Sequence, residues 1–133
     1  EDIIEATIEK LKNFDKPFFI LVEGSQIDWA EHDNDQEYLL SEMLEFDKAV
    51  DVSYKYAIEN KNTLVIVTAD HETGGAAIVS GDLEKQIVKI NYSSDEHTSE
   101  MVPVFSIGPY SEKFKGVYDN TEIFNKLFEI VKE

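Results

Sequence analysis

The 133-residue sequence contains no cysteine, no arginine and no long apolar run. Without cysteine, the chain forms no disulfide and offers no thiolate to a metal ion. All twelve basic residues are lysines, so this chain has no guanidinium group to form bidentate hydrogen bonds with an oxyanion such as phosphate. No stretch of eighteen apolar residues occurs and the chain opens on two acidic residues, so we expect neither a membrane span nor a signal peptide.

The charge balance is strongly acidic. Twenty-eight aspartates and glutamates outnumber twelve lysines, and the formal charge of −16 disfavours nucleic acids and anionic membranes as partners. Such an excess of carboxylates suits cation binding, although it is more often only a well-solvated surface. A hydrophobic content of 42% and an aromatic content of 11% are typical of a folded protein. The length predicts a single domain spanning residues 1–133.

Apolar spacing predicts strands and helices along the chain. Branched apolar runs at residues 18–22 and 63–68 predict two buried strands, and a helix at residues 36–60 lies between them, with Met43 and Tyr54 filling the core. This order indicates a right-handed unit with parallel strands, so we expect an α/β fold with a mainly parallel sheet flanked by helices. Further predicted elements are helices at residues 2–13 and after a cap at 119–121, strands at residues 76–79, 86–92 and 102–107, and a turn at residues 80–82.

Metal-ligand residue types gather where the first two predicted strands end. Glu23 follows the first strand, and Asp28 and His32 stand one helical turn apart in the segment after it. Asp70 and His71 follow the second strand, which a parallel topology brings to the same edge of the sheet. Taken singly, an aspartate and a histidine four residues apart are more often a solvated surface pair, and an aspartate before two glycines usually caps a turn.

The third histidine, His97, lies in a polar loop, where a lone histidine is usually idle. Neutral imidazole and carboxylate oxygen are, however, the ligand types of a hydrolytic zinc centre, and magnesium prefers the carboxylate-rich part of such a site. Two metal ions a few ångströms apart would clamp the attacking and leaving oxygens of a phosphoryl transfer.

Four short segments occur in an informative order. They are Glu23-Gly24-x-x-Ile27-Asp28-x-x-x-His32, Thr68-Ala69-Asp70-His71-Glu72-Thr73-Gly74-Gly75, His97-Thr98 ahead of Val102-Pro103-Val104, and Asp119-Asn120-Thr121-Glu122-Ile123-Phe124. Together they resemble the alkaline phosphatase family, over nearly the whole chain from residue 18 onward. The second segment is highly specific, and four ordered matches leave little room for chance.

The resemblance implies a fold, a chemistry and a ligand set. The family folds as a three-layer sandwich and hydrolyses phosphate monoesters with two zinc ions, one magnesium ion and a serine nucleophile that becomes phosphorylated. It is exported to the periplasm or outside the cell. By position, the first zinc would take Asp28, His32 and His97, the second zinc Asp70 and His71, and the magnesium ion Glu23.

The chain resembles only the carboxyl-terminal part of the family. The nucleophilic serine, an aspartate shared by zinc and magnesium, a threonine ligand and the phosphate-holding arginine belong to the earlier part, and Ser25 does not match the nucleophile. We therefore assign no catalytic residue and expect this chain alone to be inactive. A truncated sheet is expected to expose an edge and an apolar face, which favours a homodimer. The interval from Gly75 to His97 leaves no room for an insertion that contributes to the dimer surface in some members.

Two alternatives stay open at this point. The wider superfamily of metal-dependent phosphodiesterases, mutases and sulfatases shares the metal scaffold; the first and second segments favour a phosphatase, and the substrate range stays open. The other alternative is a non-catalytic metal-binding or interaction domain. The sequence upstream of Glu1 separates the two classes, because an Asp-Ser-Ala nucleophile there restores the enzyme and a start codon supports the binding module.

Overall fold

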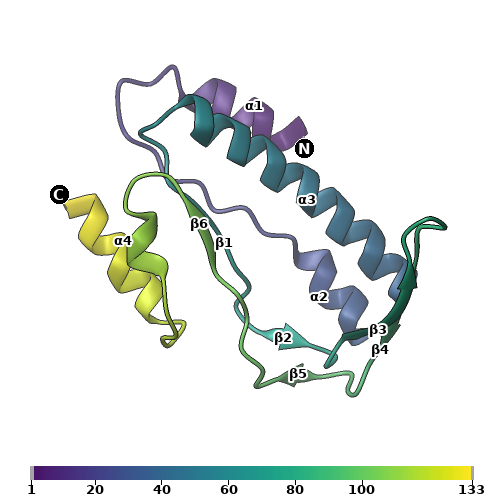
Figure 1. Ribbon diagram of the computed structural model, residues 1–133. Coiled ribbons are helices and arrows are strands. Elements are labelled where there is room, and N and C mark those ends of the chain that lie inside the picture. The colour runs from purple at the N-terminus through teal and green to yellow at the C-terminus, as the bar shows by residue number, and fades with distance from the viewer. Residues whose placement is uncertain (1, 133) are drawn as a thin grey trace. The chain divides into compact units, whose positions relative to one another are not determined.

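The computed structural model describes residues 2–132, and their strands form three separate two-stranded sheets (Figure 1). Each pair is antiparallel: β1 with β6, β2 with β5, and β3 with β4. The elements in chain order are α1 (Asp2–Leu11), α2 (Ser25–His32), α3 (Gln36–Glu59), β1 (Val65–Val67), β2 (Glu72–Thr73), β3 (Ala77–Asp82), β4 (Ile87–Asn91), β5 (His97–Thr98), β6 (Phe105–Ile107), the 3-10 helix η1 (Ser111–Phe114) and α4 (Glu122–Lys132).

The chain divides into two compact units, each assembled from two stretches. The first unit takes in the chain up to Ala49 together with His71–Met101. The second takes in Val50–Asp70 together with the chain from Val102 onward, so α3 contributes to both. The expectation of a single domain stays a prediction.

In the first unit, small and branched residues on the inner faces of three helices are buried. Ile4 and Ile8 lie one turn apart on α1, and Ala30 and Leu39 are buried on α2 and α3. The side-chain amide of Gln36, at the start of α3, accepts the Ile90 N–H at 2.7 Å and donates to the Val88 carbonyl at 2.9 Å. This one side chain thus pairs with a backbone N–H and a backbone carbonyl of β4, as a neighbouring strand would, and it ties the β3–β4 hairpin to α3.

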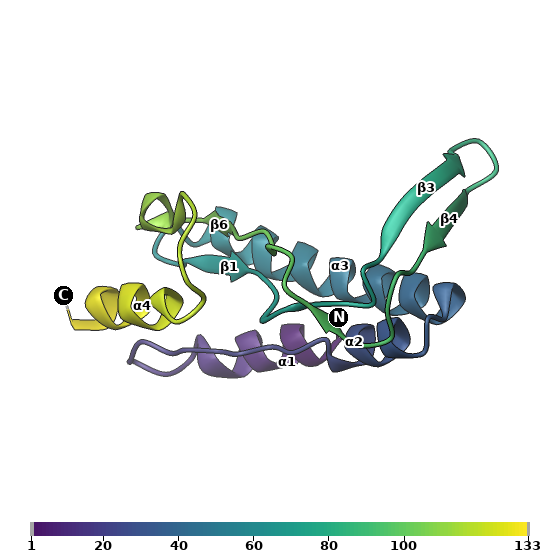
Figure 2. The same cartoon turned by 90° about the horizontal axis from the view of Figure 1, so that it is seen from below.

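In the second unit, β1 lies beside β6 with Val65 opposite Ile107 and Val67 opposite Phe105 (Figure 2). These two strands, together with Val50 and Tyr54 of α3, line an apolar groove of about 230 Å³. At the predicted cap of the last helix, the Asp119 carboxylate accepts the backbone N–H and the hydroxyl of Thr121, which closes a turn directly ahead of α4. Among residues 2–132, no helix is long and apolar enough to cross a bilayer.

The predicted strand at residues 18–22 does not form in the described chain. Its residues are extended but pair with no strand, and Phe19 and Leu21 are 69% and 83% exposed. An extended segment becomes a strand only when a neighbour accepts its hydrogen bonds. Parallel pairing between residues 18–22 and 63–68 is not present among residues 2–132, so it stays a prediction, and β1 covers only the middle of the second run.

Three smaller predictions also need correction. The turn expected at residues 80–82 lies within β3, because the Asp82 carboxylate accepts the Lys85 N–H and moves the turn to residues 83–86. Met43 and Tyr54 do not fill the core, since each is nearly half exposed. No residue of α4 is buried, although its apolar stripe predicts an inner face. A stripe marks which side of a helix is apolar, not whether another element covers it.

Gly108 provides a sharp test of the β1–β6 pairing. It adopts φ +103°, and a Cβ at this position would lie 2.0 Å from the Thr63 carbonyl oxygen. We expect Gly108→Ala to lower the free energy of unfolding by about 2 kcal/mol more than Gly116→Ala. Gly116 is the matched control, because it has φ +102° and a Cβ there would meet no atom within 4 Å. Urea denaturation of both variants measures the difference, and equal losses would contradict the clash.

Candidate metal centre

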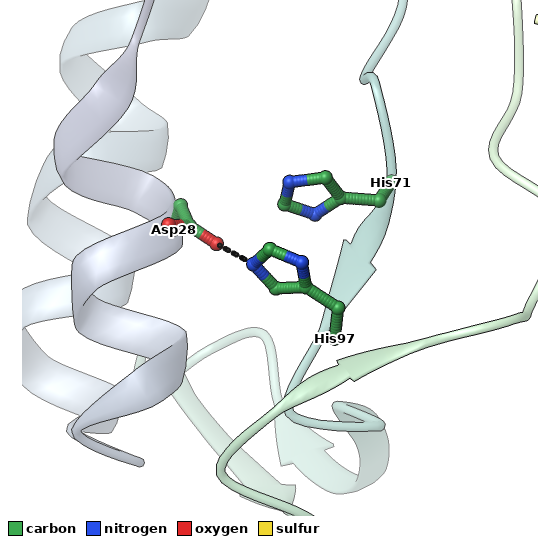
Figure 3. Close-up of side chains that lie close together, drawn as sticks. All are labelled: Asp28, His71 and His97. Carbon is green, nitrogen blue, oxygen red and sulfur yellow. Dashed lines mark ion pairs between the residues drawn. The ribbon is translucent and has the colours of Figure 1, made fainter.

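Asp28, His71 and His97 converge from three segments of the first unit (Figure 3). Asp28 lies on α2, His71 directly precedes β2, and His97 begins β5. The short β2–β5 ladder sets Thr73 opposite His97, so pairing only two residues on each strand brings the two histidines together. Their rings stack with centroids 3.6 Å apart. One ligand atom from each of the three residues lies within 4.8 Å of the other two.

His32 joins this cluster from the next turn of α2. Its Nε2 lies 3.5 Å from Asp28 Oδ1 and 3.2 Å from His97 Nε2, and His97 Nε2 lies 3.6 Å from the same carboxylate oxygen. The helical spacing of Asp28 and His32 therefore has the geometric consequence predicted from the sequence. The three atoms form a nearly equilateral triangle.

This triangle fits a tetrahedral zinc ion. With ligands at about 2.0–2.1 Å, a tetrahedral site holds its ligand atoms about 3.3 Å apart, close to the three separations in the triangle. One carboxylate and two imidazoles are also a common zinc donor set. About a third of the Asp28 and His32 side chains and half of the His97 side chain is exposed, so an ion has access from solvent.

A hydrogen bond selects the tautomer of His32. Its Nδ1 lies 2.6 Å from the Asp95 carbonyl oxygen, which only accepts, so Nδ1 carries the proton. The Nε2 lone pair is then left for the cluster, as a metal-bound histidine requires. The same bond is the main reason why the pKa of His32 is raised above its ordinary value.

The family model described as alkaline phosphatase matches residues 1–85 and 79–133 of this sequence. The chain belongs to the alkaline phosphatase family. The two matched pieces meet at the β3–β4 hairpin, in keeping with the short interval between Gly75 and His97.

Relatives of known function and structure share this family. Alkaline phosphatase 4 of Bacillus subtilis is 31% identical over 199 residues, which cover 99% of this chain and 43% of the relative. Streptomycin-6-phosphate phosphatase of Streptomyces griseus is 36% identical over 83% of this chain and 28% of its own length. The alkaline phosphatase structure from the Antarctic bacterium TAB5 is 40% identical, with a TM-score of 0.88 over 96% of this chain and 39% of that one. A mutant of the TAB5 enzyme has magnesium bound in a site called M3. The chain thus spans less than half the length of each of these relatives.

The ligand grouping found among residues 2–132 contains neither Glu23 nor Asp70. Glu23 is exposed in the extended segment ahead of α2. Asp70 is exposed and closes a stretch of the second unit. Their roles as metal ligands stay predictions.

Sequence reasoning missed three residues that surround the cluster. Glu72 accepts the backbone N–H groups of Gly75 and Ala76 at 3.2 and 3.0 Å, and it also accepts the Thr98 hydroxyl. Thr73 is buried and donates its hydroxyl to Asp28. The third residue is Glu31. The first two follow His71 directly in the most specific sequence segment, which was the one available signal.

Glu31 shares the anionic environment of Asp28 and Glu72. Burial, and then the charges of Glu72 and Asp28, raise the pKa of Glu31 from an ordinary value of 4.5 to about 7. Between these two values the folded chain holds a proton that the unfolded chain releases. The stabilising contribution of protonated Glu31 is therefore complete below pH 4.5 and is lost as the pH rises through 7.

We expect Glu31→Gln to stabilise the metal-free chain at pH 8 and to change little at pH 5, since glutamine resembles the protonated acid. Urea denaturation at both pH values, in the presence of a chelator, measures the effect. Glu100→Gln serves as the control, because it neutralises an exposed acid elsewhere in the first unit. A gain at pH 8 that is equal in both variants would assign the effect to net charge.

Proposed function

We propose that this chain is the metal-binding portion of a phosphate monoester hydrolase. The observation that carries the proposal is the triangle of Asp28 Oδ1, His32 Nε2 and His97 Nε2, with sides of 3.2–3.6 Å. Three such atoms this close repel one another unless a proton or a metal cation lies between them, and a metal ion would satisfy all three at once. Together with membership of the alkaline phosphatase family, the triangle supports a zinc site.

Each residue has a proposed task at this site. Asp28 supplies the negative charge, and His32 and His97 supply neutral nitrogen donors. His71 would serve a second zinc with Asp70, and Glu23 would serve magnesium, as the family resemblance implies. Bound zinc at such a centre would supply Lewis-acid stabilisation of the charge that develops on the ester oxygens.

The activity of the whole protein is a proposal that extends beyond this chain. Because the chain spans 43% of alkaline phosphatase 4, the nucleophile and the phosphate clamp are assigned to sequence that it does not match. In such a whole protein we propose the three-layer sandwich with a mainly parallel sheet, in which residues 18–22 gain a neighbouring strand. Export to the periplasm or outside the cell, and a homodimer, are proposed on family membership alone.

Zinc titration tests the first site. We expect calorimetry on the metal-free chain to detect one tight zinc site, with affinity lowered at least about 100-fold in Asp28→Asn, which removes the negative charge of the site, or in His97→Ala, which removes a nitrogen donor. Asp33→Asn is the matched control, since it removes the same charge just beyond α2. Absence of binding in the unmodified chain, or equal binding in Asp28→Asn, would overturn the assignment.

The 133-residue chain by itself is expected to hydrolyse no phosphate monoester, because neither the serine nucleophile nor an arginine clamp is assigned within it. A chromogenic phosphate monoester assay with zinc and magnesium present checks this, with an intact family member as the positive control. Turnover above the blank that disappears in His71→Ala would contradict it.

A further inference from the structure

Thr73 occupies an unusual place beside the metal centre. It is 1% exposed, and it is the one polar residue that is buried from solvent among residues 2–132. Its hydroxyl oxygen lies 2.7 Å from Asp28 Oδ1 and 3.2 Å from His71 Nδ1. One hydroxyl therefore touches residues that the proposed function gives to two different zinc ions.

The position of the single hydroxyl proton follows from the strength of the two acceptors. An ionised carboxylate accepts more strongly than a neutral imidazole nitrogen, so the Thr73 hydroxyl donates to Asp28. Its oxygen is then left with lone pairs, and at 3.2 Å it accepts a hydrogen bond from His71 Nδ1–H. The two hydrogen bonds therefore run in one direction: His71 Nδ1–H donates to the Thr73 oxygen, and the Thr73 O–H donates to Asp28.

Each of these two hydrogen bonds orients a side chain that is a proposed metal ligand. Asp28 Oδ1 is also the corner of the triangle with His32 and His97, so Thr73 takes one of its lone pairs and fixes the carboxylate with the other available. A proton held on His71 Nδ1 means that Nε2 carries a lone pair and not a proton, which is the state a metal-bound imidazole requires.

We propose that Thr73 is a positioning residue shared by the two proposed zinc sites. Its one buried hydroxyl orients Asp28 of the first site and fixes His71 of the second site in the Nδ1–H tautomer. The inference rests on the proposed zinc site for its metal-binding consequence. The tautomer consequence rests only on contacts within the metal-free chain.

Thr73→Val and Thr73→Ser separate this role from simple space filling. Valine keeps the shape and removes the hydroxyl, whereas serine keeps the hydroxyl and removes a methyl group. We expect valine to weaken zinc binding about 10–100-fold in calorimetry, a loss typical of second-sphere partners, and serine to retain affinity within a few-fold. Thermal unfolding of both metal-free variants verifies that they remain folded.

A spectroscopic measurement reports what a space-filling role would not change. In the metal-free chain at pH 8, the imidazole ¹⁵N shifts of His71 should show a proton on Nδ1 in the unmodified and serine proteins. In the valine variant we expect the proton to move toward Nε2. His32 is the internal control, because its tautomer is held by the Asp95 carbonyl instead.

The outcomes are distinct. A shifted His71 tautomer and weakened zinc binding in valine, with serine unaffected, support the proposal. An unchanged tautomer, or equal zinc affinity, in the folded valine variant overturns it. If the unmodified chain binds no zinc, the proposed function fails, and the tautomer comparison alone decides whether Thr73 sets the state of His71.

Discussion

The close approach of three polar atoms is the tightest electrostatic constraint in the first unit. A carboxylate oxygen and two imidazole nitrogens lie within 3.6 Å of one another, an arrangement that needs a proton or a cation to be stable. The scaffold holds this arrangement with few means. One turn of α2 places Asp28 and His32, and the ladder of two residue pairs between β2 and β5 brings His97 to them. A hydrogen bond from His32 to the Asp95 carbonyl then orients the imidazole ring, and one from the Thr73 hydroxyl orients the Asp28 carboxylate.

The part of the site that depends on local geometry could be predicted from the sequence. Helical spacing alone placed Asp28 beside His32, and α1 and α3 form over nearly the residues that their apolar patterns indicate. The approach of His97 was implied only by the family resemblance, because its strand is two residues long and has no periodicity. Glu23 and Asp70 rested on a parallel topology that the described pairs do not include.

The failures share a physical cause. Residues 18–22 have the composition of a buried strand, yet a strand depends on a partner, and composition does not tell whether one is present. The stripes on α3 and α4 mark apolar faces that stay partly uncovered. Likewise, the contacts of Glu72 and Thr73 arise from the register of β2 against β5, so they become visible only once that pairing is known. Burial of Glu31 is equally a property of packing and has no signal in the sequence.

The brevity of β2 and β5 has a consequence for motion. A ladder with two residue pairs has few backbone hydrogen bonds to break. The β2–β5 ladder is therefore expected to open more often than the longer helices α1 and α3. Amide hydrogens there would then exchange through local fluctuations well below the energy of global unfolding. An ion bound only by the closed form shifts that balance by mass action, so its concentration would set how long the ladder stays closed. The ion would then stabilise the β2–β5 region of the fold, independently of any part it has in chemistry.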